Sequence, residues 1–314
     1  MLKVALIGYG YWGTKLARNF QNLEAFDLSA IVDIKNKNLK LAKKNYPLAK
    51  LSKNYEKILR DKLIDVAIIS SPTSTHFKIA KFALENCKHI LVEKPLSLSS
   101  KKVKKLYNIA KKKNKMIFVD YPFLFSGTIK FIKKIIDKKT YGKILEIESF
   151  REQAPTRNDM NVIWDLGTHD VSILTYLLKK KPRSIRTIKK VNNNKSLCHS
   201  AYIYLKYNNN LSVIIKNSWI SPTKIRLIKI KFQKAILYCD ENEALYKIKI
   251  YKKNQNLIAS KYNLNIPEID LDEPLSKLAS YISKSIKKNK NKLFQNKLNE
   301  KITVLLEKIN RANE

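Results

Sequence analysis

The chain has 314 residues, 44% of them hydrophobic, a formal net charge of +37 at pH 7 and three cysteines that lie far apart. This length is enough for two domains with a core in each. The sequence has no apolar run long enough to span a membrane, no disulfide framework and no N-terminal signal pattern, so we expect a cytoplasmic protein. The charge would suit a nucleic-acid-binding protein, but only eight of the 63 basic residues are Arg and the Lys residues are spread through almost every segment. This favours weak, nonspecific binding to polyanions over a specific nucleic-acid site.

The first 120 residues alternate short apolar segments with segments whose apolar residues have helical spacing. Continuous apolar strands separated by amphipathic helices are typical of a parallel sheet covered on both faces. We predict strands at 3–8, 27–33, 65–72, 89–95 and 116–120. The class is therefore α/β, and residues 1–120 are predicted to form a doubly wound Rossmann domain.

From residue 121 onward strands predominate. Helices are predicted at 128–139, 162–179, 273–289 and 293–311, and strands at 143–152, 184–191, 198–207, 211–220, 224–232, 235–240 and 245–253. Short turns join consecutive strands, and one of them is the asparagine-rich YNNN at 207–210. This arrangement predicts an α+β domain over residues 121–314 with a large, open, mostly antiparallel sheet. The two C-terminal helices could pack back on the Rossmann domain.

The segment GYGYWG at residues 8–13 follows the first predicted strand and opens a predicted helix. In the dinucleotide fingerprint, Gly8 permits a tight turn, Gly10 lets the backbone approach a pyrophosphate, and Gly13 lets helix and strand pack closely. Tyr11 and Trp12 lie between these glycines, at the helix N-terminus where the phosphates would bind. The alternative interpretation is an ordinary strand–turn–helix without a ligand.

Asp33 ends the second predicted strand, twenty residues after Gly13. A carboxylate in this place binds the adenosine ribose of a dinucleotide and repels a 2′-phosphate. The sequence therefore predicts NAD as cofactor, with NADP less favoured. Lys35 and Lys37 weaken that preference because they could accommodate a phosphate.

Two further motifs, SSPTSTH (70–76) and VEKP (92–95), follow the third and fourth predicted strands. Both would lie at the carboxyl edge of the sheet, where parallel sheets bind ligands. Lys94 would reach into that crevice with Glu93 beside it. A lysine there is suited to acid–base chemistry or to holding a substrate hydroxyl.

The predicted helix at 162–179 carries Asp165, His169, Ser172 and Tyr176 at intervals of three or four residues, so these side chains form a polar stripe. Asp165 and His169 could touch, and a carboxylate beside an imidazole favours a general base. A solvated helix face is the alternative. Gly167 inside the helix suggests that another group approaches closely. A metal site is not expected, because no third ligand has suitable spacing.

In this order, GYGYWG, Asp33, SSPTSTH, VEKP and WDLGTHD (164–170) resemble the Gfo/Idh/MocA family of NAD(P)-dependent sugar and inositol oxidoreductases. The resemblance covers nearly the whole chain. It implies a catalytic group of Lys94, Asp165 and His169, which removes a hydroxyl proton while hydride passes to nicotinamide, or the reverse. It also implies a set of residues that line the nicotinamide end of the cofactor: Ser71, Pro72, Thr73, His76 and Glu93.

A narrower resemblance, carried by WDLGTHD, NSWISPTKIR (217–226) and AILYCDE (235–241), is to the family branch that acts on nucleotide sugars, which includes UDP-N-acetylglucosamine 3-dehydrogenases. It implies a UDP-sugar substrate and a keto-sugar product, with Lys224 and Arg226 as candidate contacts. Tyr121 and Thr168 depart from residues that are common in relatives, which puts the substrate in doubt. The residues expected to bind substrate are Lys94, Tyr121, Trp164, Asp165 and His169.

Alternatives are a dehydrogenase of a free sugar or inositol, and an NAD-binding regulatory protein without catalysis. The open sheet and the family resemblance also predict a homo-oligomer, either a dimer or a tetramer.

Overall fold

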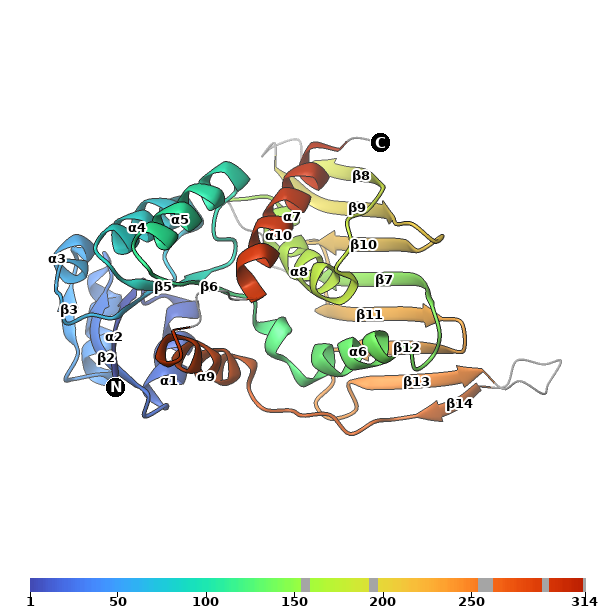
Figure 1. The fold of residues 1–314 in the computed structure, drawn as a ribbon, viewed down its shortest axis with the longest axis horizontal. Helices are drawn as coiled ribbons and strands as arrows, with labels where there is room; N and C mark the ends of the chain where they lie inside the picture. Colours follow the sequence, from blue (N-terminus) through green and yellow to red (C-terminus); the bar gives the residue numbers. More distant parts are fainter. Residues whose placement is uncertain (154–158, 192–196, 254–261, 290–293, 313–314) are drawn as a thin grey trace. The chain divides into compact units, whose positions relative to one another are not determined.

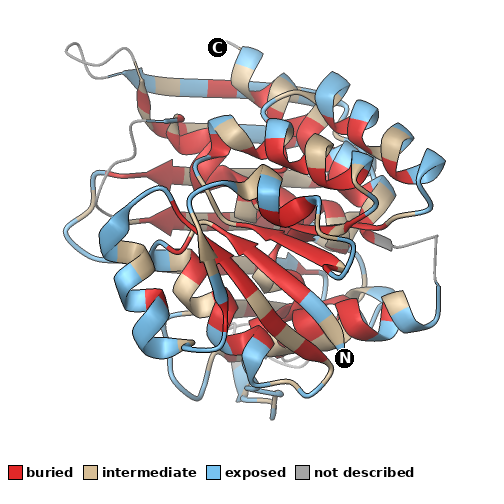
Figure 2. Ribbon diagram, turned by 90° about the vertical axis from the view of Figure 1, so that its left-hand side faces the viewer, coloured by how far each residue is buried: buried red, intermediate tan, exposed pale blue. Residues whose placement is uncertain are grey.

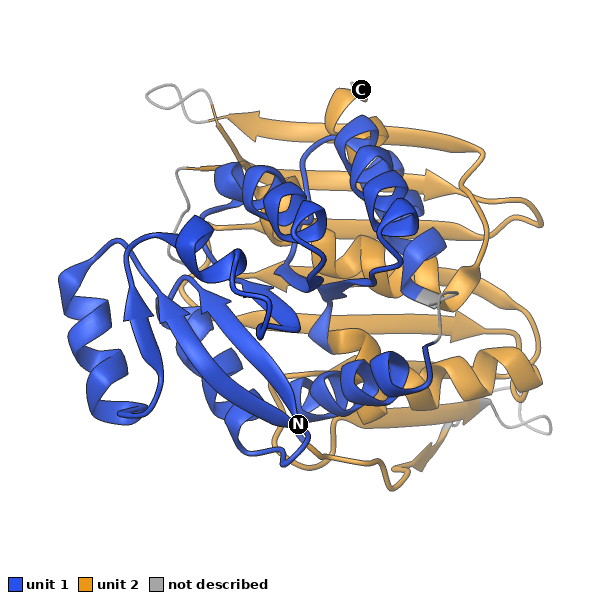
Figure 3. Ribbon diagram, turned by 60° about the vertical axis from the view of Figure 1, so that its left-hand side comes forward, with its two compact units in different colours: residues 1–122, 273–304 blue, residues 123–272, 305–314 orange. Residues whose placement is uncertain are grey.

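The computed structural model describes residues 1–153, 159–191, 197–253, 262–289 and 294–312. The chain forms two compact units, shown in different colours in Figure 3. The first comprises residues 1–122 and 273–304, and the second comprises residues 123–272 and 305–314.

The first unit contains a six-stranded sheet with strand order β3-β2-β1-β4-β5-β6, in which every neighbouring pair is parallel (Figure 1). Its strands are β1 (Leu2–Ile7), β2 (Phe26–Val32), β3 (Lys50–Ser52), β4 (Val66–Ile69), β5 (His89–Glu93) and β6 (Ile117–Asp120). Its helices are α1 (Tyr11–Gln21), α2 (Asn36–Asn45), α3 (Tyr55–Leu59), α4 (Thr73–Glu85), α5 (Ser100–Lys112), α9 (Pro274–Lys287) and the first part of α10 (Phe294–Arg311). The predicted doubly wound α/β fold is confirmed.

The core of the first unit lies on its central strands. All four residues of β4 are buried, as are the last four of β1, and Figure 2 shows this concentration of buried residues on the strands. Burial on both faces explains why these strands are continuous apolar runs in the sequence. Strand β3 was not predicted, because its three residues contain a single apolar side chain, Leu51.

The edge strand β6 is completed by a side chain from α10. The Val119 N–H donates to Gln295 Oε1 at 3.1 Å, and Gln295 Nε2 donates back to the Val119 carbonyl at 3.3 Å. The glutamine amide thus takes the place of a neighbouring strand, which protects an edge that would otherwise be open for pairing.

The second unit contains an eight-stranded sheet with strand order β14-β13-β12-β11-β7-β10-β9-β8. Its strands are β7 (Ile144–Glu152), β8 (Ser184–Val191), β9 (Cys198–Lys206), β10 (Ser212–Ser218), β11 (Ile225–Phe232), β12 (Ala235–Asp240), β13 (Ile248–Lys253) and β14 (Tyr262–Asn265). Strands β7 and β10 pair in parallel and the other neighbours pair antiparallel, which confirms the mostly antiparallel sheet. Strand β14 was not predicted.

The helical elements of this unit include the 3₁₀ helix η1 (Pro122–Phe125), which begins at the boundary of the two units, and α6 (Gly127–Lys138). The single helix expected at 162–179 is instead two helices, α7 (Val162–Asp165) and α8 (Gly167–Leu178). A Cβ on Gly167 would lie 2.8 Å from Asn217 Oδ1, so the close approach that we expected at this glycine is confirmed. The YNNN turn is confirmed as well, since Asn209 and Asn210 have φ values of 63° and 59°.

Among the described residues, no helix is both long and apolar enough to cross a membrane.

Candidate active site

The glycine turn after β1 has the geometry that a dinucleotide needs. Gly8 has φ +97°, and a Cβ there would lie 2.7 Å from the Ser71 nitrogen. A Cβ on Gly13 would overlap the Gly8 carbonyl oxygen, so α1 packs directly on the turn. Gly10 is different, because a Cβ there would meet nothing within 4 Å. Two glycines therefore serve packing, and the third leaves its backbone open, as the close approach of a pyrophosphate requires.

Gly10 is also the N-cap of α1. No side chain caps this end among the residues that the structure describes, and the first turn has no acidic residue. The first N–H groups of a helix carry partial positive charge and lack partners within the helix. The open space at Gly10 therefore faces donors suited to a phosphate, and this part of the chain fits the cofactor that the sequence predicts.

Asp33, directly after β2, is buried and connects the glycine turn to the second strand. Its Oδ2 accepts from the Tyr9 backbone N–H at 2.8 Å and from Asn38 Nδ2 at 2.9 Å, and its Oδ1 accepts from the Lys35 N–H at 2.8 Å. A carboxylate has about four acceptor positions, so Asp33 keeps acceptor capacity for a ribose hydroxyl. Its structural role in holding the turn was not foreseen.

The motifs after β4 and β5 are joined by His76. This buried ring, on α4, has Nε2 at 2.8 Å from the Ser71 carbonyl oxygen and Nδ1 at 2.9 Å from the Pro95 carbonyl oxygen. Lys94, immediately before Pro95, is buried as well. His76 therefore holds the two loops together and restricts the position of Lys94. Thr73 is buried at the start of α4 after Pro72, its N-cap, and Glu93 ends β5.

Asp120, at the end of β6, is a further candidate site residue, which our sequence interpretation did not single out. It pairs in register with Glu93, and its Oδ2 accepts from Trp12 Nε1 at 2.5 Å. Burial raises the pKa of Asp120 to about 6, although the Trp12 hydrogen bond and the Lys94 charge both lower it. A carboxylate at the carboxyl end of a parallel strand was the available signal.

In the second unit, α7 and α8 carry the predicted Asp165 and His169. Asp165 is buried and its Oδ2 accepts from Trp219 Nε1 at 3.1 Å, so the alternative of a solvated helix face is wrong for this residue. The His169 ring packs edge-on against Phe123, with ring centroids 5.2 Å apart. Trp164 is buried on α7, and its backbone N–H donates to Asn161 Oδ1 at 3.2 Å.

The two departures from the family pattern are both buried. Thr168 turns its hydroxyl back to the Trp164 carbonyl at 2.5 Å, which satisfies the polar group within its own helix. Tyr121 follows β6, and burial raises the pKa of its phenol, with the Tyr107 and Glu93 charges adding to the effect.

A buried cluster around Asp170 fixes α8 to the sheet. Asp170 Oδ1 accepts from Ser149 Oγ at 2.8 Å and from Arg151 Nε at 3.1 Å, and Asp170 Oδ2 accepts from Asn217 Nδ2 at 2.7 Å. These donors come from β7 and β10. Because Asp170 follows His169 directly, the cluster also fixes the start of the helix turn that carries the imidazole. The sequence analysis did not identify it.

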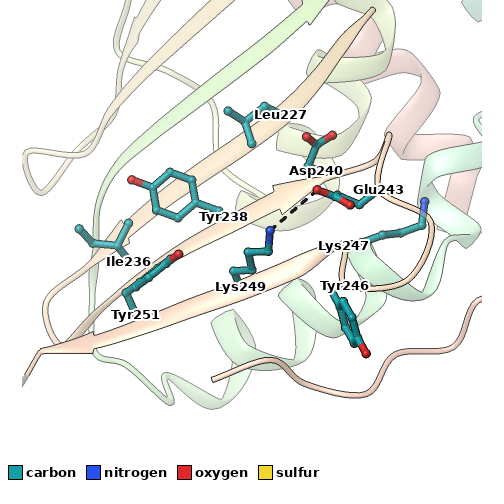
Figure 4. A pocket seen from close by; sticks show the side chains of 9 residues that line it. All are labelled: Leu227, Ile236, Tyr238, Asp240, Glu243, Tyr246, Lys247, Lys249 and Tyr251. Atoms are coloured by element: carbon teal, nitrogen blue, oxygen red, sulfur yellow. Dashed lines mark ion pairs between the residues drawn. The ribbon is translucent and has the colours of Figure 1, made fainter. Parts of the chain in front are cut away.

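A pocket of about 370 Å³ lies on the face of the second unit's sheet that points away from α8 (Figure 4). Tyr238 and Tyr251 line it, and Lys249 is paired there with Glu243. It contains none of the predicted site residues. Tyrosines are enriched at protein contacts, whereas Lys, Glu and Asp are depleted there, so this lining does not test the homo-oligomer, which stays a prediction.

The predicted residues thus fall into two groups. The cofactor residues and Lys94 belong to the first unit, whereas Asp165 and His169 belong to the second. That Lys94, Asp165 and His169 act as one catalytic group stays a prediction. In the described part of the chain, no cluster of three or more His, Cys, Asp or Glu side chains could hold a metal ion.

Comparison with known proteins gives two adjacent family matches. Residues 2–121 match the Gfo/Idh/MocA oxidoreductase family with its NAD-binding Rossmann fold, and residues 129–241 match the Gfo/Idh/MocA C-terminal domain. A myo-inositol 2-dehydrogenase from Thermotoga maritima is 26% identical over 191 residues, which cover 59% of this chain and 57% of the relative. A UDP-N-acetylglucosamine 3-dehydrogenase from Acidithiobacillus ferrooxidans is 27% identical over 127 residues, covering 40% of this chain and 39% of the relative. Across such curated relatives the match spans 29% to 66% of the relative's length.

Similar solved structures span the whole chain. A 3-ketoreductase from Actinomadura kijaniata, crystallised with TDP-benzene and NADP, has a TM-score of 0.89 at 12% identity and covers 100% of this chain and 98% of its own. At this identity the likeness shows the fold.

Proposed function

Because the chain belongs to the Gfo/Idh/MocA family of NAD-binding oxidoreductases, we propose that it is an NAD-dependent dehydrogenase that oxidises a hydroxyl group of a nucleotide-linked hexose to a ketone. The observation that carries the proposal is the glycine turn, where Gly8 and Gly13 are packed and Gly10 faces open space. The name of the A. ferrooxidans relative supports a UDP-sugar as substrate class.

NAD is proposed over NADP because of Asp33. Its buried carboxylate is held by three donors at the end of β2, where the adenosine ribose binds in this fold. A negative charge fixed in that place favours a ribose hydroxyl and repels a phosphate. When bound, the nicotinamide ring supplies the acceptor for a hydride.

The proposed chemistry uses three side chains of this chain. The His169 imidazole takes the proton from the sugar hydroxyl as the carbon loses its hydride, so the sugar loses two electrons and two hydrogens in total. Lys94 donates a hydrogen bond to the reacting oxygen and stabilises its developing negative charge. Asp165, oriented by Trp219, binds a substrate hydroxyl or supports the imidazolium.

The test is a single-turnover experiment that follows NADH absorbance. The purified protein is loaded with NAD and mixed in turn with UDP-N-acetylglucosamine, its uronic acid form, free glucose or myo-inositol. Lys94→Ala and His169→Ala are compared with Lys104→Ala, an exposed lysine on α5 that serves as the control. The proposal requires that a UDP-sugar reduces the cofactor, that both site variants abolish this, and that the control does not.

A dehydrogenase of free polyols is the second candidate, favoured by the myo-inositol 2-dehydrogenase relative. Oxidation of inositol but not of UDP-sugars would select it. NAD binding without turnover of any sugar would leave the non-catalytic alternative.

A further inference from the structure

Two arginines flank one phenylalanine beside His169 in the second unit. The Arg151 guanidinium carbon lies 4.5 Å from the centroid of the Phe123 ring, and that of Arg226 lies 5.8 Å from the same centroid. The His169 ring contacts Phe123 as well, at 5.2 Å between centroids. Three cationic or basic side chains therefore surround one aromatic ring.

The sheet register places the two arginines directly opposite each other. Strands β7 and β11 are antiparallel, and Arg226 pairs with Arg151 in the ladder. Both side chains lie on the face that also carries the buried Ile147 and Ile228, because alternate residues of a strand share a face. Like charges in directly opposed positions destabilise a sheet. An arrangement of this kind favours the binding of an anion.

Asp170 satisfies only some of the N–H donors of the Arg151 guanidinium. It accepts from Arg151 through Nε, at 3.1 Å, and the side chains of this pair are 3% and 0% exposed. Arg151 Nη1 is buried and has no hydrogen-bond partner among the residues that the structure describes. A buried charged N–H without an acceptor is costly. Arg226 Nη2 donates to Gln153 Oε1, at 3.3 Å.

A purely structural role would explain the Arg151–Asp170 pair, since the pair fixes α8 to β7. It would not explain why a second guanidinium lies opposite the first, or why an N–H on the far side of Arg151 is left unsatisfied. An oxyanion explains both, because guanidinium groups bind carboxylates and phosphates through paired N–H groups. Phe123 contributes a cation–π contact to each arginine.

We propose that Phe123, Arg151 and Arg226 form an oxyanion subsite for a negatively charged group of the sugar substrate. This inference rests on the proposed function, because it places the anion near His169, the proposed base. The oxyanion could be a carboxylate on the sugar ring or a phosphate attached to the sugar. In either case a neutral polyol would bring no negative charge to the two opposed guanidinium groups, so the enzyme discriminates against neutral substrates.

The test compares Arg226→Gln with Lys231→Gln by isothermal titration calorimetry. Each variant removes one positive charge from β11, but Lys231 is exposed on the other face of the strand, so it controls for nonspecific attraction by the net charge. The probes are UDP-N-acetylglucosamine, free N-acetylglucosamine, glucuronate and inorganic pyrophosphate. Loss of a charge-assisted hydrogen-bond pair predicts anion binding about 10- to 100-fold weaker in Arg226→Gln and unchanged in Lys231→Gln.

The probes separate the two sources of the oxyanion. If glucuronate binding falls and pyrophosphate binding does not, the subsite takes a sugar carboxylate; the reverse result assigns a phosphate. Arg151→Lys, which keeps a charge opposite Asp170, provides a second variant that should weaken the same ligand. The proposal is overturned if wild-type protein binds neither anion, or if both Gln variants weaken binding equally.

Failure of the subsite is distinguishable from failure of the proposed function. If wild-type protein binds NAD and oxidises a neutral sugar as readily as an anionic one, the dehydrogenase stands and the subsite is wrong. If NAD does not bind while glucuronate or pyrophosphate binding depends on Arg226, the anion site stands and the dehydrogenase is wrong.

Discussion

The candidate site of the first unit is formed mainly by the backbone, whereas that of the second unit is formed by buried charged side chains. At the carboxyl edge of the first unit, the turn at Gly8 and the N-terminus of α1 are backbone features, with Asp33 as the charged side chain that secures them. In the second unit, the environment of His169 is made of buried charged side chains, with Asp170 and Arg151 at its centre. The first site should therefore be sensitive to added volume, and the second to removed charge. The following predictions test this difference.

The largest effect is expected at Asp170. Asp170→Ala would leave the Arg151 guanidinium buried without its partner and would free two further donors, Ser149 and Asn217. Breaking a buried ion pair from one side costs about 3–5 kcal/mol. Ser149→Ala is the matched control, because Asp170 then keeps two of its three donors, and the expected loss is about 1 kcal/mol. Chemical denaturation measures both, and equal losses would show that the cluster does not act through charge.

A contrast between two glycines comes next. Gly13→Ala would push a methyl group into the Gly8 carbonyl, so the free energy of unfolding should fall by about 1–3 kcal/mol. Because the turn is displaced, NAD binding should be lost as well. Gly10→Ala adds its methyl group to open space, so stability should stay within about 1 kcal/mol of wild type. NAD affinity should nevertheless fall, because the methyl group occupies the place of the pyrophosphate. Thermal unfolding and NADH fluorescence titration separate these effects. Unchanged NAD affinity in Gly10→Ala would place the phosphates elsewhere.

This contrast also explains what could be predicted from the sequence. The glycine turn, Asp33 and the strands around them lie in short, contiguous stretches whose spacing has a direct geometric meaning, so the Rossmann fold and its cofactor edge were predictable. The eight-stranded sheet was predictable as mostly antiparallel from its strand lengths and turns. Strands β3 and β14 were missed because they are short and also lack the continuous apolar run that marks the four-residue strands β4 and β6.

The side-chain clusters were not predictable in the same way. Arg151 and Arg226 are 75 positions apart, and only the register of β7 with β11 brings them opposite each other. The interruption at Leu166 between α7 and α8 likewise coincides with a tertiary contact, that of Asn217 with Gly167, and no local propensity announces it. Asp120 was visible as the end of a strand, but its partner Trp12 is 108 positions away. Long-range pairing therefore decides the chemistry that the local pattern leaves open.

An effect that disappears as pH falls is expected at Asp120, a buried carboxyl group of the first unit. Burial raises its pKa from 3.8 to about 6, so the folded protein binds more protons than the unfolded chain between these values. Linkage then requires that Asp120 lowers stability as pH rises through this interval. A shift of about two pKa units corresponds to a penalty of at most about 3 kcal/mol above pH 6, and to none below about pH 4.

Asp120→Asn removes this charge while keeping an acceptor for Trp12. It should therefore stabilise the protein by about 1–3 kcal/mol at pH 7–8 and by progressively less as pH falls to 4. Burial lowers the pKa of His89 to about 4, which gives the opposite pH dependence, but His89 is present in both proteins and cancels from the difference. Trp12→Phe should raise the pKa of Asp120 further, because it removes the hydrogen bond that stabilises the carboxylate. The loss of stability caused by Trp12→Phe should therefore grow with pH when Asp120 is present and should not depend on pH when Asp120 is replaced by Asn. Urea unfolding from pH 4 to 8 measures both. A stability gain in Asp120→Asn that does not change with pH would mean that Asp120 is not the group that titrates. The stability of the first unit would then not depend on charge at this edge of the sheet, in contrast to the Asp170 cluster of the second unit.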